Sequence, residues 1–500
     1  MGIFMARSSL SYRTAQSSSA GNDEEFLNRG LYTRLRSQIL TGHFRPGTKL
    51  PSTRALSASV GVSRNTVVHA FEQLAAEGYL SARSGSGSYV AANLPDNLIQ
   101  SKTTMIVTHE QRNDGRFDHP IYASAEHSPL RFARAQELRP FMIKIPALDA
   151  FPYSVWARLQ ERQWKKRRAD MLRYADPAGY LPLRKAIHSY LTTSRGVQCQ
   201  PEQVVVVAGA QQALRLVSQV LIRPGDPVWV EEPGYFGAQA VFQDAAAKIV
   251  PVKVDAEGLS VSAGIASHPR ARLVYTTPGH QFPLGVSMSV ARRFELLQWA
   301  AKSGARILED DYDSEFRYSS RPLPSLQGHD RNASVIYIGS FSKTIFPALR
   351  LGYMVVPMDL LARIQTAKFL TDWHSSTMDQ CIVADFINDG HFMRHLRRMR
   401  TLYMERLDAL LTSAHSELSG FLNIARPHAG MHAVATLPDG VDGGAVARAL
   451  NRAGASTFPV SSCHLSFSRS STLLLGFAAF SPPQIKQGCR LLAATLERVL

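Results

Sequence analysis

The sequence predicts an α/β protein made of two unlike folded parts joined by a long linker. Between about residues 141 and 390, short apolar runs such as VVVV at 204–207 alternate with amphipathic segments, which is typical of a mostly parallel sheet with helices on both faces. Residues 31–91 instead predict three helices followed by a β-hairpin. The stretch between the two parts is polar, contains proline and lacks amphipathic order, which predicts a linker.

These patterns divide the chain into five segments. The N-terminal stretch is rich in Ser, Gly and charge without periodicity, and the last stretch begins as a long basic helix followed by a small α/β unit. The predicted segments are a mobile tail at 1–25, the helical head at 26–92, the linker at 93–140, a large α/β domain at 141–390 and a small subdomain at 391–500. With 500 residues, of which 45% are hydrophobic, the chain can bury more than one core.

Charge and cysteine content narrow the class of protein. The formal net charge of +16 favours a polyanionic partner such as nucleic acid, with an acidic substrate or a membrane surface as alternatives. The four cysteines are scattered and form no CxxC pair, so neither a disulfide framework nor a metal site is expected. The sequence has no apolar run of about 18 residues and no apolar signal core. We therefore expect a cytoplasmic protein without a membrane partner.

The third predicted helix of the head carries polar residues at the turn where a helix can meet DNA. Ser63 is a good N-cap, and the turn that follows it is expected to be exposed, while the hairpin tip would approach phosphate. The candidate DNA-contacting residues are Arg54, Arg64, Asn65, Thr66, Gly85 and Gly87. The inward apolar stripe of this helix is predicted to be Val67, Ala70, Phe71 and Leu74. The competing interpretation is a small packing domain with solvated arginines.

In the large domain, Lys343 follows the end of an apolar strand in GSFSKTIFPALRLGY. A lysine amine can form a Schiff base with an aldehyde, and a pyridoxal 5'-phosphate site needs several further groups around that lysine. A carboxylate must pair with the pyridine nitrogen, and Asp310 in LEDDYDSEF can do so, with Tyr312 near enough to hydrogen-bond the ring's phenolic oxygen. Taken singly, a lysine after a strand is usually a solvated loop residue, and the EDD run could be an exposed turn.

The phosphate of such a cofactor needs amides at a helix N-terminus, which VVVVAGAQQAL provides as strand, turn and helix. An aromatic ring should cover the pyridine face, and Tyr235 in EEPGYFG is the candidate. The candidate phosphate-binding residues are Gly209, Ala210, Gln211, Ser340, Ser342 and Arg350. All these residues fall at the ends of predicted parallel strands, where doubly wound sheets bind ligands, so we expect them to form one site.

Two family resemblances are carried by these motifs. The stretch HFRPGTKLPSTRALSASVGVSRNTVVHAFEQLAAEGYLSARSGSGSYV resembles the winged helix-turn-helix of GntR-type bacterial repressors. Residues 141–500 resemble the fold-type I aminotransferases in RYADPAGYLPLRKAI, VVVVAGAQQAL, EEPGYFG, TTPGHQFPLGVSMS, LEDDYDSEFRY and GSFSKTIFPALRLGY. The whole arrangement is similar to the MocR-like regulators of the GntR superfamily.

The resemblance implies a transcriptional regulator that binds a double-stranded DNA operator and acts as a head-to-tail homodimer. It implies that Lys343 carries pyridoxal 5'-phosphate as an internal aldimine, and that Asp310 and Tyr312 hold the ring nitrogen and the phenolic oxygen. It also implies that Tyr174 reaches across the dimer to the partner's phosphate. Either His280 or Gln281 is expected on the phenolic-oxygen side of the ring.

Two positions depart from the family pattern. Where relatives carry an arginine that grips a ligand carboxylate, STLLLGFAAF places Leu474, and no arginine lies between Arg469 and Arg490. Loss of that charge-assisted pair would weaken amino-acid binding by about 2 kcal/mol. Lys144 stands where relatives tend to have glycine beside the ligand. Its amine could meet an anionic effector or point into solvent.

We expect the body to sense an amine or amino-acid-like effector through aldimine chemistry on Lys343, with at most slow transaminase half-reactions. One alternative is an active aminotransferase with a DNA-binding appendage, which fast turnover with a keto acid would reveal. The other is a direct sensor of pyridoxal phosphate that controls vitamin B6 synthesis. The arginine missing at Leu474 favours this sensor mildly, because it needs no carboxylate clamp.

Overall fold

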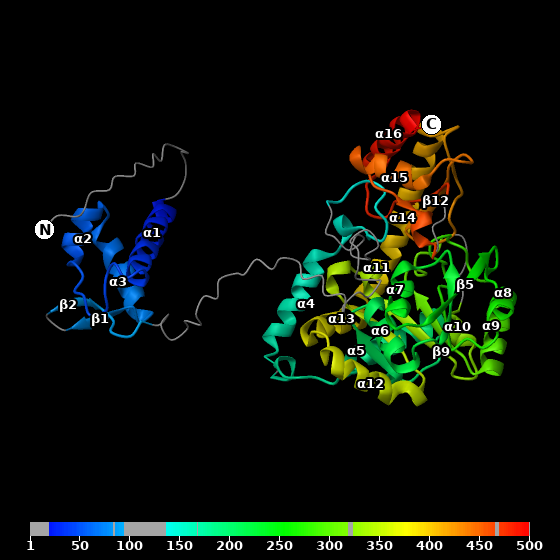
Figure 1. The fold of residues 1–500 in the computed structure, drawn as a ribbon, viewed down its shortest axis with the longest axis horizontal. Helices are drawn as coiled ribbons and strands as arrows, with labels where there is room; N and C mark the ends of the chain where they lie inside the picture. The colour runs from blue at the N-terminus through cyan, green and yellow to red at the C-terminus, as the bar shows by residue number, and fades with distance from the viewer. Residues whose placement is uncertain are drawn as a thin grey trace. The chain divides into compact units, whose positions relative to one another are not determined.

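The computed structural model describes residues 20–83, 86–94, 137–167, 169–318, 324–465 and 470–499. The chain divides into two compact units, one within residues 1–115 and the other within 116–500, which we call the head and the body (Figure 1). None of the helices in the described ranges combines the length and apolar character that crossing a bilayer requires.

The described part of the head contains three helices and one hairpin, as the sequence predicts. Its elements are α1 (Ala20–Leu40), α2 (Thr53–Val60), α3 (Arg64–Ala76), β1 (Leu80–Arg83) and β2 (Gly87–Val90). One apolar core joins them, and it includes Leu31, Leu56, Leu74, Leu80 and Val90. The two strands pair antiparallel, with Leu80 opposite Val90. The head therefore has a hydrophobic core of its own.

The first helix of the head begins earlier than expected. A tail was predicted for residues 1–25, whereas Ala20 already starts α1. The remaining residues of the predicted tail and most of the predicted linker lie outside the described residues.

The body is built on a mixed sheet with the strand order β3-β10-β9-β8-β7-β4-β5-β6 in the described residues. The strands are β3 (Val204–Val207), β4 (Pro227–Glu232), β5 (Lys248–Asp255), β6 (Gly258–Leu259), β7 (Leu273–Thr276), β8 (Arg306–Asp311), β9 (Val335–Ser340) and β10 (Gly352–Val355). The adjacent strands β9, β8, β7, β4 and β5 are parallel, while β10 and β6 run against their neighbours. The predicted, mostly parallel sheet is confirmed.

Helices cover both faces of this sheet, because neighbouring strand residues point to opposite sides. The helices of this part are α4 (Tyr153–Lys165), α5 (Leu181–Arg195), α6 (Ala210–Leu221), α7 (Phe236–Asp244), α8 (Val261–Ser267), α9 (Val290–Ser303), α10 (Leu326–His329), α11 (Phe341–Thr344), α12 (Met358–Asp372) and α13 (Thr377–Asn388). In β4, Val228 and Val230 pack with α6, α7 and α12, whereas Trp229 packs with α8 and α9. The helices α5 and α13 cover this second face near β3 and β10.

The C-terminal elements gather at one end of the body (Figure 1). They are α14 (His391–Glu417), β11 (Asn423–Ile424), β12 (His432–Thr436), α15 (Gly443–Arg452), β13 (Phe458–Pro459), β14 (Thr472–Gly476) and α16 (Pro482–Val499). Their strands form an antiparallel sheet in the order β11-β12-β14-β13. The predicted small α/β subdomain is therefore present at the end of the chain.

The start of the body packs on this C-terminal sheet rather than on the large one. Phe141 forms an antiparallel bridge with Gly476, and the backbone N–H of Ser456 donates to Pro140 O at 2.8 Å. Residue 140 was expected to end the linker, and residue 141 was expected to open the large domain. Sequence periodicity missed this packing because the two partners are more than 300 residues apart in the chain.

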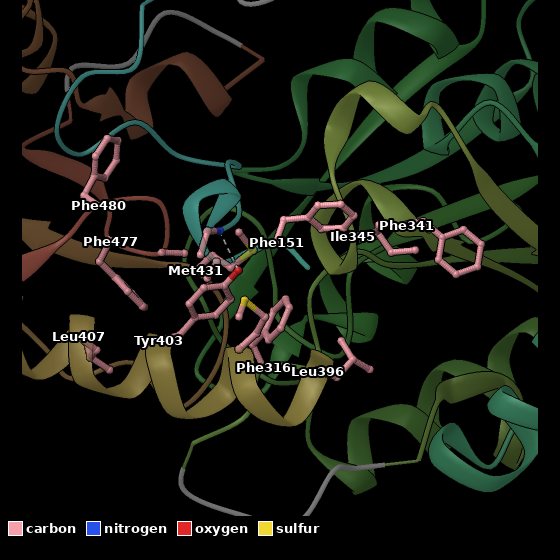
Figure 2. Close-up of a cluster of buried hydrophobic side chains, with 14 of the residues drawn as sticks. Phe151, Phe316, Phe341, Ile345, Leu396, Tyr403, Leu407, Met431, Phe477 and Phe480 are labelled. Carbon is pink, nitrogen blue, oxygen red and sulfur yellow. Dashed lines mark hydrogen bonds between the residues drawn. The ribbon is translucent and has the colours of Figure 1, made fainter. Parts of the chain in front are cut away.

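A continuous apolar core joins the large sheet to the C-terminal elements (Figure 2). Tyr403 of α14 is buried in this core, and its hydroxyl oxygen accepts a hydrogen bond from the backbone N–H of Ala147 at 3.1 Å. Phe151, Ile345 and Met431 join the same cluster from three other segments. The segment around Ala147 is therefore anchored, and that segment leads directly into the cavity described next.

Candidate functional site

The body encloses a cavity of about 150 Å³ at the ends of its central strands. Among the described residues, it is lined by Lys144, Gly209, Ala210, Gln211, Tyr235, Tyr275, Thr277, Phe282, Asp310, Tyr312, Ser340, Ser342, Lys343 and Arg350. Ten of the predicted ligand-binding residues thus come together, and Tyr174 and His280 do not line the cavity. Three lining residues were not predicted as ligand contacts, namely Tyr275, Thr277 and Phe282, and Lys144 was left open between an effector contact and a solvent-pointing side chain.

Lys343 projects into this cavity from α11, directly after β9. Its Nζ donates a hydrogen bond to the backbone oxygen of Lys144 at 2.9 Å. Burial, opposed by the carboxylates of Asp313 and Asp310 and assisted by Arg350, lowers the pKa of Lys343 to about 8. A larger share of this amine is therefore neutral near pH 7 than for an ordinary lysine. The interpretation of Lys343 as a solvated loop residue is wrong.

Asp310, the residue before the last of β8, lies on the cavity side of the sheet. Its Oδ2 accepts a hydrogen bond from the Tyr275 hydroxyl at 2.8 Å, while its Oδ1 is buried without a hydrogen-bond partner in the described structure. Burial raises the pKa of this carboxyl to about 7, and the bond from Tyr275 opposes that rise. The EDD run is buried, so its interpretation as an exposed turn is wrong. A positively charged ligand atom at Oδ1 would satisfy this buried oxygen.

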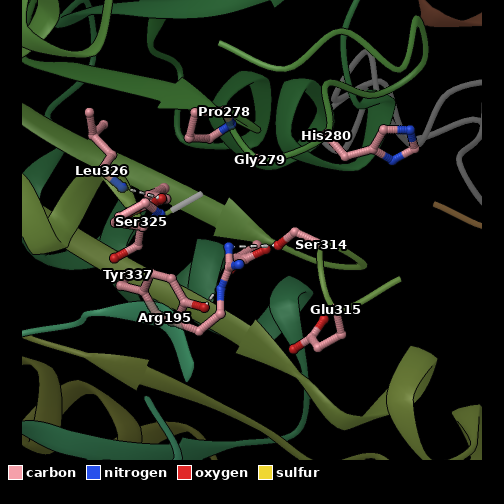
Figure 3. Close-up of polar contacts among 12 residues, drawn as sticks. Arg195, Pro278, Gly279, His280, Ser314, Glu315, Ser325, Leu326 and Tyr337 are labelled. Atoms are coloured by element: carbon pink, nitrogen blue, oxygen red, sulfur yellow. Dashed lines mark hydrogen bonds and ion pairs between the residues drawn. The ribbon is translucent and has the colours of Figure 1, made fainter. Parts of the chain in front are cut away.

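Asp311, the next residue along the strand, points to the opposite face, where it contacts Arg195. Figure 3 shows Arg195 with its second partner, Ser314. Arg195 donates from Nε to Asp311 Oδ2 at 2.9 Å and from Nη2 to Ser314 Oγ at 2.8 Å. The Tyr337 hydroxyl donates to the same carboxylate oxygen at 2.6 Å. These bonds hold the end of β8 in place, so the direction of the Asp310 side chain is fixed by the strand.

The N-terminus of α6 opens on the same cavity. Gly209 is the N-cap with φ 115° and ψ −179°, a conformation that a residue with a Cβ rarely adopts. A Cβ at Gly209 would lie 3.7 Å from the Arg350 guanidinium, so this arginine lies beside the helix start. Free amides at a helix start, together with a guanidinium, form a binding site for an anionic group. Ser340 and Ser342 add hydroxyls to the cavity wall.

Aromatic residues enclose the remaining walls of the cavity. The Tyr235 hydroxyl accepts a hydrogen bond from Gln211 Nε2 at 2.8 Å, which fixes the ring beside the start of α6. Tyr312 lines the cavity, and its hydroxyl lies 3.0 Å from His280 Nδ1. The same nitrogen lies 2.9 Å from Asp313 Oδ1. His280 therefore supports Tyr312 from behind the cavity wall.

The amide of Gln281 points away from the cavity, because its Nε2 donates to Pro233 O at 2.9 Å and to Phe282 O at 2.7 Å. Between the two candidates left open by the sequence, only His280 contacts Tyr312. Tyr174 lies elsewhere on the body. Its side chain is 78% exposed and stacks on Trp373 with ring centroids 4.4 Å apart.

The two positions that depart from the family pattern lie beside the cavity. Leu474 of β14 is fully buried and packs in a cluster with Phe282 and Cys463. Lys144 lies on the cavity wall with φ 70°, in the left-handed region that favours glycine. Its ammonium lies over aromatic rings rather than in solvent, so the solvent-pointing alternative for Lys144 is wrong.

The head presents part of its predicted DNA-contacting set on the surface. Arg54, Arg64 and Asn65 are exposed at the starts of α2 and α3. The N-cap Ser63 accepts a hydrogen bond from the backbone N–H of Thr66 at 3.1 Å. The Thr66 side chain is buried, with its hydroxyl 2.8 Å from Ser63 Oγ, so the expectation of an exposed Thr66 is wrong.

The hairpin tip is only partly described. Gly87 starts β2 with φ 108°, which suits glycine, and Gly85 lies outside the described residues. The four apolar residues of the predicted inward stripe of α3 are all buried, as expected: Val67, Ala70, Phe71 and Leu74. The exposed polar turn and the buried stripe therefore lie on different sides of α3.

Both units match described protein families. Residues 149–492 match "Aminotransferase class I and II", and residues 27–90 match "Bacterial regulatory proteins, gntR family". The probable rhizopine catabolism regulatory protein MocR of Rhizobium meliloti is 38% identical, covering 92% of this chain and 92% of that protein. The pyridoxine biosynthesis transcriptional regulator PdxR of Corynebacterium glutamicum is 32% identical, covering 75% of this chain and 76% of that protein.

Among solved structures, the body is similar to LysN, the α-aminoadipate aminotransferase of Thermus thermophilus, solved as a complex with N-(5'-phosphopyridoxyl)-L-leucine. The two are 29% identical with a TM-score of 0.67, covering 72% of this chain and 92% of the other. The multiple substrate aminotransferase of Thermococcus profundus gives 28% identity and a TM-score of 0.67, covering 74% of this chain and 93% of that one.

Proposed function

This chain belongs to the MocR-like regulators, in which a GntR-family winged helix-turn-helix precedes an aminotransferase class I and II domain, and we propose that its body senses a primary amine at Lys343. The protein is a DNA-binding transcriptional regulator with pyridoxal 5'-phosphate as its cofactor. The observation that carries the effector proposal is that Lys343, Asp310 and the start of α6 line one cavity.

The residues present fit this cofactor. The unpartnered Oδ1 of Asp310 suits a protonated pyridine nitrogen, and the α6 start beside Arg350 suits a phosphate. We assign Tyr312 to the phenolic oxygen of the ring and Tyr235 to its face. The remaining phosphate-binding assignments are Gly209, Ala210, Gln211, Ser340 and Ser342. Support for these assignments comes from their common position on the cavity wall.

When bound, the cofactor supplies an aldehyde that condenses reversibly with primary amines and a ring that withdraws electrons. Lys343 provides the resident amine, and its lowered pKa makes the neutral, nucleophilic form more accessible near pH 7. Asp310 holds a positive charge opposite that amine and orients the ring. Tyr312, positioned by His280, would hydrogen-bond the phenolic oxygen of the ring.

An effector amine that displaces Lys343 frees a side chain in the wall between the large sheet and the C-terminal elements. We propose that this change favours one conformation of the dimer over another, and so alters how the two heads meet their DNA half-sites. A head-to-tail homodimer would bring the exposed Tyr174 to the partner's phosphate. Because the operator is DNA, we expect this function in the cytoplasm.

The test is an absorbance scan of the purified full chain loaded with pyridoxal 5'-phosphate, before and after addition of primary amines. After borohydride reduction and denaturation, the wild type and Lys302→Ala, at an exposed lysine of α9, should keep the cofactor covalently attached, whereas Lys343→Ala should release it. Cofactor that stays covalently attached in Lys343→Ala would overturn the assignment. Rapid, repeated conversion of an amine and a keto acid by the wild type would instead favour the aminotransferase alternative.

A further inference from the structure

The cavity holds a third cation in addition to Lys343 and Arg350. Lys144 lines the same wall, and its backbone oxygen accepts the hydrogen bond from Lys343 Nζ. Arg350 lies beside the start of α6, at the end of the cavity that suits the phosphate. Lys343 is the reactive amine of the proposed function. Lys144 is therefore the cation that neither cofactor binding nor imine chemistry accounts for.

The ammonium of Lys144 lies in an aromatic cage. Its Nζ is 4.5 Å from the ring centroid of Phe236, 4.6 Å from that of Phe282 and 4.8 Å from that of Tyr235, with Phe458 at 5.9 Å. Rings stabilise a cation through their faces but accept none of its N–H bonds as a carboxylate does. Within the described residues, no hydrogen bond or ion pair reaches this Nζ.

The backbone conformation at Lys144 is strained for a lysine. Its φ of 70° lies in the left-handed region, where glycine is less strained than lysine. Burial and the nearby charge of Lys343 together lower the pKa of the amine to about 7, against the opposing effects of Cys463 and the Asp310 carboxylate. An anion that entered the cage would oppose both causes. Among the described residues no counter-ion pairs with this amine, which points to a ligand that carries negative charge.

The same aromatic residues surround the position where an arginine is missing. Leu474 lies opposite Phe458 in the β14–β13 pairing and packs against Phe282, two of the rings of the Lys144 cage. The leucine side chain has no polar group to offer an anion. The cation in this region is therefore Lys144, from the first segment of the body, and not a residue of β14. Lys144 lies close to the apolar surroundings of Leu474.

We propose that Lys144 anchors the effector of this regulator by pairing with a carboxylate, so that the site selects a primary amine that also carries one carboxylate. This inference rests on the proposed function, because it requires an amine to react in the cavity. Lys144 then binds the carboxylate of the ligand, while the amine of the ligand replaces Lys343. Phe282, which lines the cavity and is backed by Leu474, contacts the apolar part of the ligand between them.

The experiment compares matched ligands that differ only in the anion, using the full chain loaded with pyridoxal 5'-phosphate. The probes are glycine against ethanolamine, 3-aminopropanoate against 3-aminopropanol, and 4-aminobutanoate against 4-aminobutanol. The readout is the apparent Kd from the change in cofactor absorbance. At a pH of about 6.5, at least one amino acid should bind about tenfold more tightly than its alcohol, the usual effect of a charge-assisted hydrogen bond.

Two variants remove the ammonium in different ways. Lys144→Met keeps the length of the side chain, and Lys144→Gly relaxes the left-handed backbone, so one misfolded variant cannot decide the result. In both, the ratio of the two affinities should fall to about one. A general change in the cavity would alter the affinities for the acid and the alcohol alike, so it would leave their ratio unchanged. In the wild type, the ratio should also fall as the pH rises to about 8.5, because Lys144 loses its proton.

Each outcome is decisive. Equal binding of acids and alcohols by the wild type, or an acid preference that survives in both variants, would refute the role of Lys144 and leave the proposed function intact. A cofactor absorbance that no amine alters would refute the proposed function itself, and this inference with it.

Discussion

The Tyr275 hydroxyl donates a hydrogen bond of 2.8 Å to Asp310 Oδ2, while the other oxygen of the same carboxylate has no partner in the described structure. The two residues lie on adjacent parallel strands, where Tyr275 of β7 pairs with Leu308 of β8. Asp310 is two residues further along β8 and so points to the same face as Leu308. Strand register therefore orients one oxygen and leaves the other facing the cavity.

Replacing Asp310 by asparagine should weaken binding of pyridoxal 5'-phosphate about 10- to 100-fold, because a buried charge-assisted hydrogen bond to the ring nitrogen is lost. Tyr275→Phe keeps the charge and removes only the orienting bond, so its effect should be smaller, about fivefold. Both affinities can be measured by titrating the cofactor-free variants and following absorbance. An Asp310→Asn variant with wild-type affinity would contradict the assignment of the ring nitrogen to this carboxylate.

The raised pKa of Asp310 predicts how the stability of the cofactor-free protein depends on pH. Burial raises this pKa from 3.8 to about 7, so the folded state binds the proton more tightly than the unfolded state. The stabilisation by the protonated form is complete below about pH 4 and is lost as the pH rises through about 7. Asp310→Asn cannot ionise, so its free energy of unfolding should lack this part of the pH dependence.

The measurement is urea unfolding of wild type and Asp310→Asn at a series of pH values, without cofactor. The difference in the free energy of unfolding should shift in favour of the variant by about 1–3 kcal/mol between pH 4 and 8. Burial also raises the pKa values of Glu309 and Glu315 to about 7, but both carboxyls are present in the two proteins and cancel in the difference. A constant difference would show that Asp310 titrates normally.

Much of the cavity was predictable because its residues follow strands or start helices. Lys343, Asp310 and Gly209 each come directly after an apolar run, and parallel strands bring such ends to one edge of the sheet. The fold was predictable for the same reason, since apolar runs and amphipathic helices alternate along the chain. What escaped prediction was Tyr275, because an inner strand residue carries no sign of which strand lies beside it.

The aromatic cage around Lys144 could not be predicted from the sequence for a different reason. Its rings come from Tyr235, Phe236, Phe282 and Phe458, which together span more than 200 residues of the chain, and no local pattern joins them. The sequence left the direction of this lysine open. Thr66 failed for a local reason: its hydroxyl bonds to the N-cap Ser63, which turns the side chain inward.

The pair formed by Arg195 and Asp311 should contribute strongly to the stability of the body. Both side chains are buried, and the closest nitrogen–oxygen distance is 2.6 Å. Arg195→Met would leave the Asp311 carboxylate buried without its cation, which should cost about 3–5 kcal/mol of unfolding free energy. Thermal unfolding of the full chain would show this as a lower Tm of the body.

An exposed ion pair provides the control. Arg490 lies 3.1 Å from Glu417, with 62% of the arginine side chain exposed to solvent. Because solvent screens such a pair, Arg490→Met should change the unfolding free energy by less than about 1 kcal/mol. Equal effects of the two substitutions would contradict the importance given to burial of Arg195.

The exposed turn of α3 should contribute to DNA binding through Arg64. The operator is first obtained by selecting duplexes from a random pool with the wild-type chain. Arg64→Ala should then weaken binding to the selected duplex about 10- to 100-fold without lowering the Tm of the head, because the side chain is exposed. Arg34→Ala removes an equal charge from the exposed side of α1 and serves as the control.

A repeated selection with the Arg64→Ala variant shows what Arg64 contacts. If Arg64 reads a base, the selected duplexes should lose their preference at one position. If Arg64 contacts phosphate, the preference should stay, and the slope of log affinity against log salt should become shallower by about one. Equal, small effects of the two substitutions would place the DNA-binding face elsewhere on the head.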